Sequence, residues 1–300
     1  VEEGCWGLLQ KIIKKAVVKL MNDNCWGNPD AFSMVLRCTK MRYARTFLNC
    51  GQIKFSTPSS WVEYEEKYGD GRGDRLEGTM ATFNIWDFEN SLPILRKYSH
   101  YTDLLKIQNG NRIYLKRRRD MHLPCFCLYY LKNSMFICPK EPGIQKLKTS
   151  IPYSYFRDLA DNMSPEEVQK LPEDERPVLI VIEDYPEFKR RLVHKLIEIG
   201  LLDREIIETK VSYFDFDQYG EFGWWDFGQK SPMELAVKHI RFKDQNEGRF
   251  IINTDNQRIL QLLDKPIEIG PLDDICILCD HYLYDGMDIV MTAKVEQIEE

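Results

Sequence analysis

Hydrophobic residues follow a helical spacing near the start of the chain. Between residues 7 and 21, seven apolar side chains fall on one stripe of a helix, and four lysines lie largely elsewhere. The pattern predicts an amphipathic helix, which we interpret as a helix packed on the core. A helix that binds a membrane surface or a partner is the alternative. A polar segment with Gly27 and Pro29 ends the pattern.

Three more helices are predicted from their end signals. One covers about 40 to 50 and stops at Gly51. A second begins at Ser164, where Glu167 completes a capping box. A third runs from Pro186 to Gly200, with proline at its start and glycine at its end.

Short segments with strand patterns make up much of the remaining chain. They read "QIKFSTP", "RIYLKRR", "LPCFCLYYL", "PVLIVIED", "KVSYFDFD", "RFIINTD", "DICILCD" and "DIVMTAKVE". These strands do not alternate regularly with helices, which favours a mixed α+β fold over a doubly wound parallel sheet. No repeat or glycine-serine linker divides the chain. We therefore predict an N-terminal helical elaboration over 1–30 and a single main domain over 31–300.

Composition and charge exclude several classes of protein. With 43% hydrophobic and 29% charged residues, the chain resembles an ordinary soluble globular protein. A net charge of -6 argues against a nucleic-acid footprint over the whole chain. Nine cysteines form no regular framework, so we expect reduced thiols and a cytoplasmic protein. The sequence shows no secretory leader pattern and no run of 18 apolar residues, so no membrane span is expected.

The segment "GDGRGDRLEG", residues 69–78, combines four glycines with five charged residues. Its spacing fits neither a P-loop, nor a dinucleotide fingerprint, nor an EF-hand. A mobile surface turn and a functional loop both remain open for it.

Cysteines and basic residues supply two weaker candidates. Cys125, Cys127, Cys138 and the 276–279 pair are potential zinc ligands, but their spacing favours buried structural cysteines, and we expect no metal. The basic run 116–119 suits either a polyanion site or the solvated edge of a strand.

A polar segment that enters a strong strand carries the last candidate. If Gln245 and Glu247 are extended, their side chains point the same way because strand side chains alternate. A carboxylate there can bind ribose hydroxyls and stabilise oxocarbenium-like charge. The alternative is a charged turn with a solvated Glu247 and Arg249 as its partner.

Several segments, in order over residues 34–275, resemble an uncharacterised prokaryotic domain family that is distantly related to ADP-ribosyltransferases and often accompanies mobile elements and defence genes. They are "MVLRCTKMRYARTFLNCGQIKFSTPSSW", "GDRLEG", "CFCLYYL", "KHIRFKDQNEGRF" and "IEIGPLDDI". The resemblance implies an ADP-ribosyltransferase-like split β-sandwich. It also implies NAD as the substrate.

The resemblance also implies roles for individual residues. Arg37 would hold the NAD pyrophosphate, and Ser56 or Thr57 would order the nicotinamide side of the pocket. Glu247 would engage the ribose as nicotinamide leaves, and Gln245 would help to select the acceptor.

The loop 69–78 takes the family's acidic position in this comparison. Asp74 and Glu77 would lie near the NAD-side cleft, and Arg72 and Arg75 would be available to phosphate or to an acceptor.

The implied function is an NAD-dependent ADP-ribosyltransferase-like enzyme. It would be a toxin or anti-phage effector that modifies protein or nucleic acid, with a regulatory partner protein left open. The alternative is a binding or sensor protein of a phage-defence system that keeps the scaffold without catalysis. A metal-dependent nuclease that uses Asp74, Glu77 and the run 116–119 is the third and least favoured hypothesis.

Overall fold

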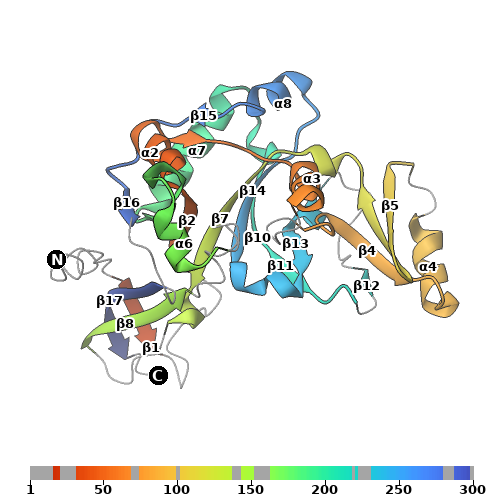
Figure 1. Cartoon of the computed structure of the whole chain (residues 1–300), viewed down its shortest axis with the longest axis horizontal. Coiled ribbons are helices and arrows are strands. Elements are labelled where there is room, and N and C mark those ends of the chain that lie inside the picture. Colours follow the sequence, from red (N-terminus) through yellow and green to blue (C-terminus); the bar gives the residue numbers. More distant parts are fainter. Residues whose placement is uncertain are drawn as a thin grey trace. The chain divides into compact units, whose positions relative to one another are not determined.

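The computed structural model describes residues 16–20, 32–68, 74–98, 102–136, 143–151, 163–217, 220–221, 231–279 and 287–297. These residues form a mixed α+β structure with several mainly antiparallel sheets, as the sequence predicts (Figure 1). The chain divides into two compact units. Unit 1 comprises 1–49, 129–189 and 271–300, and unit 2 comprises 50–128 and 190–270.

A group of antiparallel strands forms the centre of unit 1. They are β2 (Phe32–Lys40), the last four residues of β7 (Cys125–Lys132), β9 (Pro177–Ile182) and β16 (Cys276–Cys279). β2 pairs with β7 on one side and with β9 on the other, and β16 pairs with β9. All five residues from Val178 to Ile182 are buried, which explains why this strand is a continuous apolar run.

Two helices contact each other in unit 1. α2 (Met41–Cys50) follows β2 directly, and α7 (Tyr185–Glu198) begins in this unit. The rings of Phe47 and Phe188 lie 5.9 Å apart, so the two helices pack through aromatic side chains. Both helices end near a glycine with positive φ, Gly51 at 62° and Gly200 at 108°, as the sequence predicts.

The segment that starts at Ser164 forms the predicted capping box. The Ser164 hydroxyl accepts from the Glu167 N–H, and the Glu167 carboxylate accepts from the Ser164 N–H. Short helical elements complete the described part of unit 1: α6 (Pro165–Lys170), η2 (Asn133–Met135) and η4 (Glu173–Glu175).

The prediction of an N-terminal helix is wrong over residues 16–20, the part of it that the structure describes. Ala16–Leu20 is a strand, β1, that runs parallel to β17 (Met287–Gln297), and β17 pairs antiparallel with β8 (Gly143–Ile151). Two adjacent β-branched residues, Val17 and Val18, favour the strand once a partner is present. Residues 7–15 of the predicted helix lie outside the described residues.

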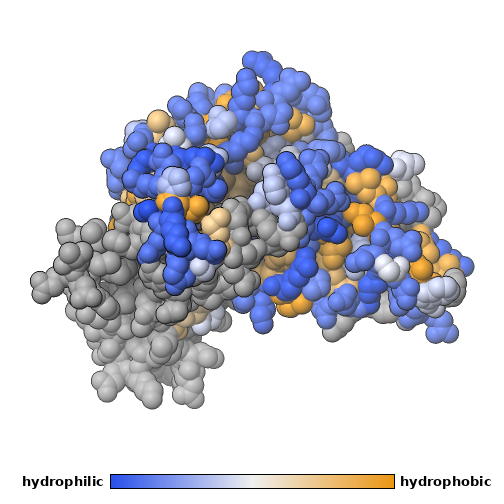
Figure 2. Space-filling view, in the orientation of Figure 1, coloured by the Kyte–Doolittle hydropathy of each residue, from blue (hydrophilic) through white to orange (hydrophobic). Residues whose placement is uncertain are grey.

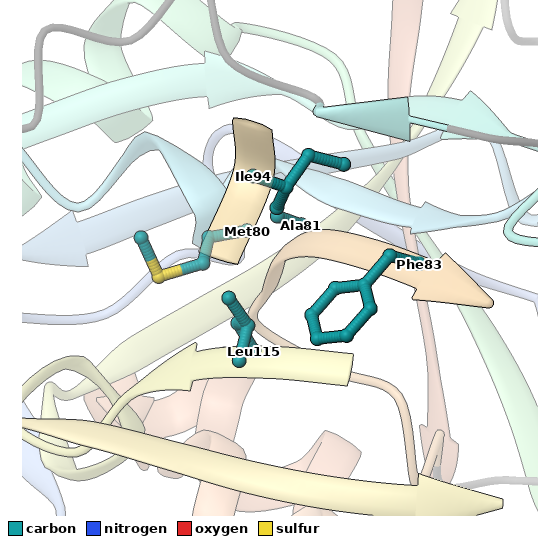
Figure 3. Packing of buried hydrophobic residues seen from close by; sticks show 5 residues of the cluster. All are labelled: Met80, Ala81, Phe83, Ile94 and Leu115. Carbon is teal, nitrogen blue, oxygen red and sulfur yellow. The ribbon is translucent and has the colours of Figure 1, made fainter. Parts of the chain in front are cut away.

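A sheet and a helix form one part of unit 2. The strand order is β12 (Gly220–Glu221), β4 (Thr79–Asn84), β6 (Arg112–Arg117) and β5 (Leu104–Asn109). Helix α4 (Phe88–Tyr98) supplies Ile94 to the hydrophobic cluster in Figure 3, where it meets Met80, Ala81, Phe83 and Leu115. The sheet is therefore held by apolar side chains from both strands and helix.

The remaining elements of unit 2 include several that line the site described below. β14 (Glu247–Ile252) lies between β10 (Ile206–Lys210) and the start of β7. Two small strand pairs are β11 (Ser212–Phe214) with β13 (Val237–His239), and β3 (Gln52–Ile53) with β15 (Ile267–Glu268). The helices are α3 (Pro58–Tyr68), α8 (Gln257–Leu263), η1 (Asp120–His122), η5 (Asp203–Glu205), η6 (Met233–Ala236) and η7 (Ile240–Gln245).

The described surface is mostly polar on the face shown in Figure 2, and its hydrophobic residues form small separate groups. Within the described residues, no helix combines the length and the apolar composition needed to span a membrane.

Candidate functional site

A cavity of about 200 Å³ in unit 2 brings together charged and polar side chains from several elements of that unit. It is lined by Trp61, Asp74, Glu77, Cys127, Lys238, Gln245, Glu247 and Arg249. Three carboxylates and two cationic side chains thus meet at one place, although they range from Asp74 to Arg249 in the sequence. A concave site with clustered titratable groups is the usual form of a binding or catalytic site.

The strand β14 places two of these side chains on the same side. Glu247 and Arg249 are two residues apart in an extended strand, so both point toward the cavity. The Nε of Arg249 donates to Oε1 of Glu247 at 2.5 Å. The N–H of Glu247 donates to the hydroxyl of Tyr213 at 2.9 Å, which fixes the start of the strand.

Gln245 reaches the site by a different geometry from the predicted one. It ends the 3-10 helix η7, and Asn246 then adopts a left-handed conformation with φ of 39° before the strand begins. The extended arrangement predicted for Gln245 and Glu247 is therefore wrong. Lys238 nevertheless brings the two side chains together, because its Nζ donates to Gln245 Oε1 at 2.7 Å and to Glu247 Oε2 at 2.8 Å.

Arg249 joins Glu247 to a second acid. Its Nη1 donates to Glu77 Oε1 at 2.5 Å and to the backbone oxygen of Leu235. Its guanidinium carbon lies 4.9 Å from the centre of the Trp61 ring, within the range of a cation–π contact. The Arg249 side chain is fully buried, so each of these contacts compensates for lost hydration.

Burial and neighbouring charges act on the two glutamates with opposite outcomes. Burial by itself raises the pKa of Glu247, but the charges of Arg249 and Lys238 outweigh it and hold the pKa well below its usual range. Burial also raises the pKa of Glu77, and there it prevails over the opposing charges of Arg249 and Lys238. Glu247 is thus held ionised, whereas Glu77 is the better proton acceptor of the pair.

The cationic groups are held in their charged forms. Burial lowers the pKa of Arg249, but the carboxylates of Glu247 and Glu77 outweigh this effect and raise it well above its ordinary value. The same two carboxylates raise the pKa of Lys238 against the effect of burial. The alternative of a charged turn with a solvated Glu247 is therefore wrong about solvation, since only 8% of Glu247 is exposed, but right about Arg249 as its partner.

A tight turn places the acids that precede β4. The N–H of Glu77 donates to the Asp74 backbone oxygen at 2.9 Å, and the N–H of Leu76 donates to Asp74 Oδ1 at 2.9 Å. Buried Lys116 donates from Nζ to the Arg75 backbone oxygen at 2.5 Å. Asp74 and Glu77 are each 1% exposed, so this part of the glycine-rich segment is not a solvated surface turn.

The other predicted residues of the acidic loop lie apart from the cavity lining. Arg75 is exposed and contributes its backbone oxygen to Lys116. Arg72 lies outside the described residues. Of the four loop candidates, the structure thus brings Asp74 and Glu77 together with Glu247 and Gln245.

The three predicted cofactor-binding residues are not among the residues that line this cavity. Arg37 is part of β2 in unit 1, where its guanidinium carbon lies 5.8 Å from the ring of Phe47. Ser56 forms a backbone bridge with Cys125. Thr57 precedes α3, and its hydroxyl accepts from the Ser60 N–H at 3.2 Å, so it acts as an N-cap.

The basic run 116–119 is not the solvated edge of a strand. It continues β6, which lies between β4 and β5. Arg117 approaches two buried acids, Glu234 at 3.3 Å and Asp120 at 3.4 Å. Arg119 pairs with Asp120 and with Asp255. Arg117 and Arg119 thus compensate within unit 2 for the buried carboxylates of Asp120 and Glu234.

Metal ligation has little support in the described part of the chain. The one group of potential ligands found there is Asp215, Asp217 and His239, and both aspartates are exposed. The Nδ1 of His239 accepts from the Arg241 N–H at 3.1 Å, so a backbone donor already uses that nitrogen. Burial also raises the pKa of the Cys125 thiol to about 12, which disfavours the thiolate that zinc requires.

Trp61 and Lys238 were not singled out from the sequence, whereas Cys127 was considered only as a zinc ligand and Arg249 only as the partner of Glu247. Arg249 had a local signal, because it is a charged residue inside a strongly apolar strand segment. The others carry no such signal, since contacts far apart in the sequence bring them to the cavity.

Comparison of the chain with protein-family models, with curated proteins and with solved structures gives no match.

Proposed function

We propose that this protein is an NAD-dependent ADP-ribosyltransferase-like enzyme, and that the cavity around Glu247 is its reaction site. One observation carries the proposal: Glu247 lines a cavity as a carboxylate that two cationic groups hold ionised, beside Gln245. The mixed α+β structure is compatible with an ADP-ribosyltransferase-like split β-sandwich, which we propose as the finer description of the fold.

The chemistry of NAD cleavage suits a fixed anion. When the bond between nicotinamide and ribose breaks, positive charge develops on the ribose. A carboxylate that is already ionised and held in place stabilises this charge without reorganising. Trp61 lines the same cavity and offers an aromatic surface to a planar ring.

The expectation that Arg37 binds the pyrophosphate and that Ser56 or Thr57 orders the nicotinamide side stays a prediction. Its support is the resemblance described above. The same holds for a protein or nucleic-acid acceptor, a regulatory partner, and a toxin or anti-phage role.

A second candidate function is a binding or sensor protein without catalysis. The observation in its favour is that both carboxylate oxygens of Glu247 already accept hydrogen bonds, from Arg249 Nε and from Lys238 Nζ. Ribose hydroxyls would have to share or replace these bonds. A carboxylate that is paired in this way also suits a structural network or a ligand-binding pocket.

Incubation of the pure protein with NAD, with nicotinamide release as the readout, tests the proposal directly. We expect Glu247→Gln to lower the rate at least a hundredfold, because the amide has no charge with which to stabilise the ribose cation. The matched control is Glu63→Gln on the exposed side of α3, which should leave the rate unchanged.

Calorimetric titration with NAD separates the two candidates. Binding together with nicotinamide release supports the enzyme, and binding without release supports the sensor. Equal rates of nicotinamide release in the wild-type protein and in Glu247→Gln would show that Glu247 takes no part in the reaction.

A further inference from the structure

The two glutamates of the cavity differ in how their oxygens are used. In Glu247, Oε1 accepts from Arg249, Oε2 accepts from Lys238, and the Cys127 thiol adds a further hydrogen bond. In Glu77, Oε1 accepts from Arg249, whereas Oε2 accepts no hydrogen bond from the described residues. Lys238 Nζ lies 3.9 Å from that oxygen, beyond hydrogen-bond reach.

This difference separates two chemical roles. A carboxylate whose oxygens are all engaged by donors is a weak base, because protonation would break one of those contacts. A carboxylate with an unused oxygen beside a cavity can accept a proton without losing a contact. Burial raises the pKa of Glu77, which acts in the same direction.

Asp74 is the other carboxylate of the lining, and its geometry does not suit proton transfer. Its Oδ1 accepts from the Leu76 N–H at 2.9 Å and so holds the turn. Its Oδ2 is fully buried and has no hydrogen-bond partner among the described residues. A base must touch the group that gives up the proton, and this oxygen is closed to an incoming ligand.

The turn that carries Glu77 is built to hold it in place. Gly78 follows with φ of 72°, and a Cβ there would lie 3.0 Å from Met121 Sδ and 3.3 Å from Leu235 Cδ2. A side chain would therefore be strained at this position, and glycine lets the turn pack closely against η1 and η6. Glu77 is thus presented to the cavity by a tightly packed backbone.

We propose that Glu77 is a catalytic residue that removes the proton from a neutral acceptor, while Glu247 remains a fixed anion; this inference rests on the proposed function. The acceptor oxygen or nitrogen forms a bond to the ribose carbon, and the glycosidic bond breaks. Its electron pair leaves with nicotinamide, which becomes neutral. The acceptor's proton goes to Glu77 Oε2 and passes to solvent after the product leaves.

The proposal defines the class of acceptor. A hydroxyl, amine or amide loses a proton when it is joined to ribose, so it needs a base. An anionic nucleophile has no proton to lose, so it needs no base. The site is therefore suited to neutral O–H or N–H acceptors.

The test uses water as the neutral acceptor and azide as the anionic one, with nicotinamide release and the ribosyl product measured by chromatography. We expect Glu77→Gln to slow the reaction with water by a hundredfold or more and to change the reaction with azide less than about threefold. Calorimetry should show NAD affinity within about threefold of wild type, and Glu63→Gln serves as the control for both nucleophiles.

If Glu77→Gln lost the same rate with water as with azide, or lost none with water, the role of Glu77 as the base would be overturned. The proposed function would be unaffected by that result. If the wild-type protein consumed no NAD with either nucleophile, the proposed function would fall and this inference with it. Should Glu77→Gln not fold, the wild-type pH profiles decide, measured where azide remains an anion: we expect the rate with water to fall toward acid pH and the rate with azide to stay level. Two coinciding profiles would overturn the proposal.

Discussion

Arg249 and Glu77 lie 172 residues apart in the sequence, yet Nη1 of Arg249 donates to Oε1 of Glu77 at 2.5 Å. The same guanidinium holds Glu247 through Nε. One buried cation therefore compensates for two buried carboxylates and ties the turn before β4 to the strand β14. A bridge of this kind determines the shape of the cavity as well as its charge.

Replacement of Arg249 should be strongly destabilising. Arg249→Met keeps much of the side-chain volume but leaves Glu77 and Glu247 without their main partner, and we expect a loss of about 3 to 5 kcal/mol in the free energy of unfolding. The matched control is Arg241→Met, whose exposed side chain lies 3.6 Å from Asp74 and should contribute less than about 1 kcal/mol. Urea denaturation measures both, and similar losses in the two variants would contradict this account.

Much of the fold could be predicted because its signals are local. The apolar run of β9, the capping box at Ser164 and the glycine after α2 each depend on a few neighbouring residues. The strand β1 was missed for the opposite reason. Its pairing partner, β17, lies some 270 residues further along the chain, and the helical spacing of 7–21 gave no sign of it.

The site could be predicted only in part, because several of its contacts join residues that are far apart in the sequence. Gln245 and Glu247 were found from their spacing, although the left-handed Asn246 makes their actual geometry different. Lys238 joins those two side chains from β13, and Trp61 contacts Arg249 from α3. Such contacts follow from the tertiary fold, so no local pattern encodes them.

Gly51 should resist substitution far more than Gly110. A Cβ at Gly51 would lie 2.1 Å from the backbone oxygen of Gly270, and its φ of 62° is unfavourable for other residues. At Gly110 the φ is similar, at 57°, but the space is open. We expect Gly110→Ala to cost about 1 kcal/mol and Gly51→Ala about 3 to 4 kcal/mol. Thermal or urea unfolding of the two variants checks the difference, and equal costs would mean that the clash is relieved.

Cysteine reactivity should follow burial. Cys50 is exposed, whereas Cys125 is buried and its pKa is raised to about 12, so little thiolate forms there at pH 8. We expect iodoacetamide to label Cys50 at least about a hundredfold faster than Cys125 in the folded protein. Peptide mass spectrometry measures each site, and labelling in urea is the control in which both should react. Comparable rates in the folded protein would show that β7 opens readily.

Lys116 should make stability depend on pH in the alkaline range. Burial lowers its pKa from 10.5 to about 8, although the carboxylates of Glu77 and Asp74 oppose the change. Between these two values the unfolded chain binds a proton at Lys116 that the folded chain does not, so the free energy of unfolding rises with pH through this window. The difference between the two pKa values corresponds to a rise of about 3 kcal/mol in the free energy of unfolding.

The variant Lys116→Met isolates this contribution from other groups that titrate in the same range. It removes the titrating amine and also the hydrogen bond to the Arg75 backbone oxygen. We therefore expect a smaller rise in stability between pH 8 and 10.5 than in the wild-type protein, whereas Lys106→Met on the exposed side of β5 should keep the full rise. Urea denaturation at several pH values gives the slopes. A slope that Lys116→Met leaves unchanged would mean that Lys116 keeps its charge in the folded protein, held by the acids of the cavity.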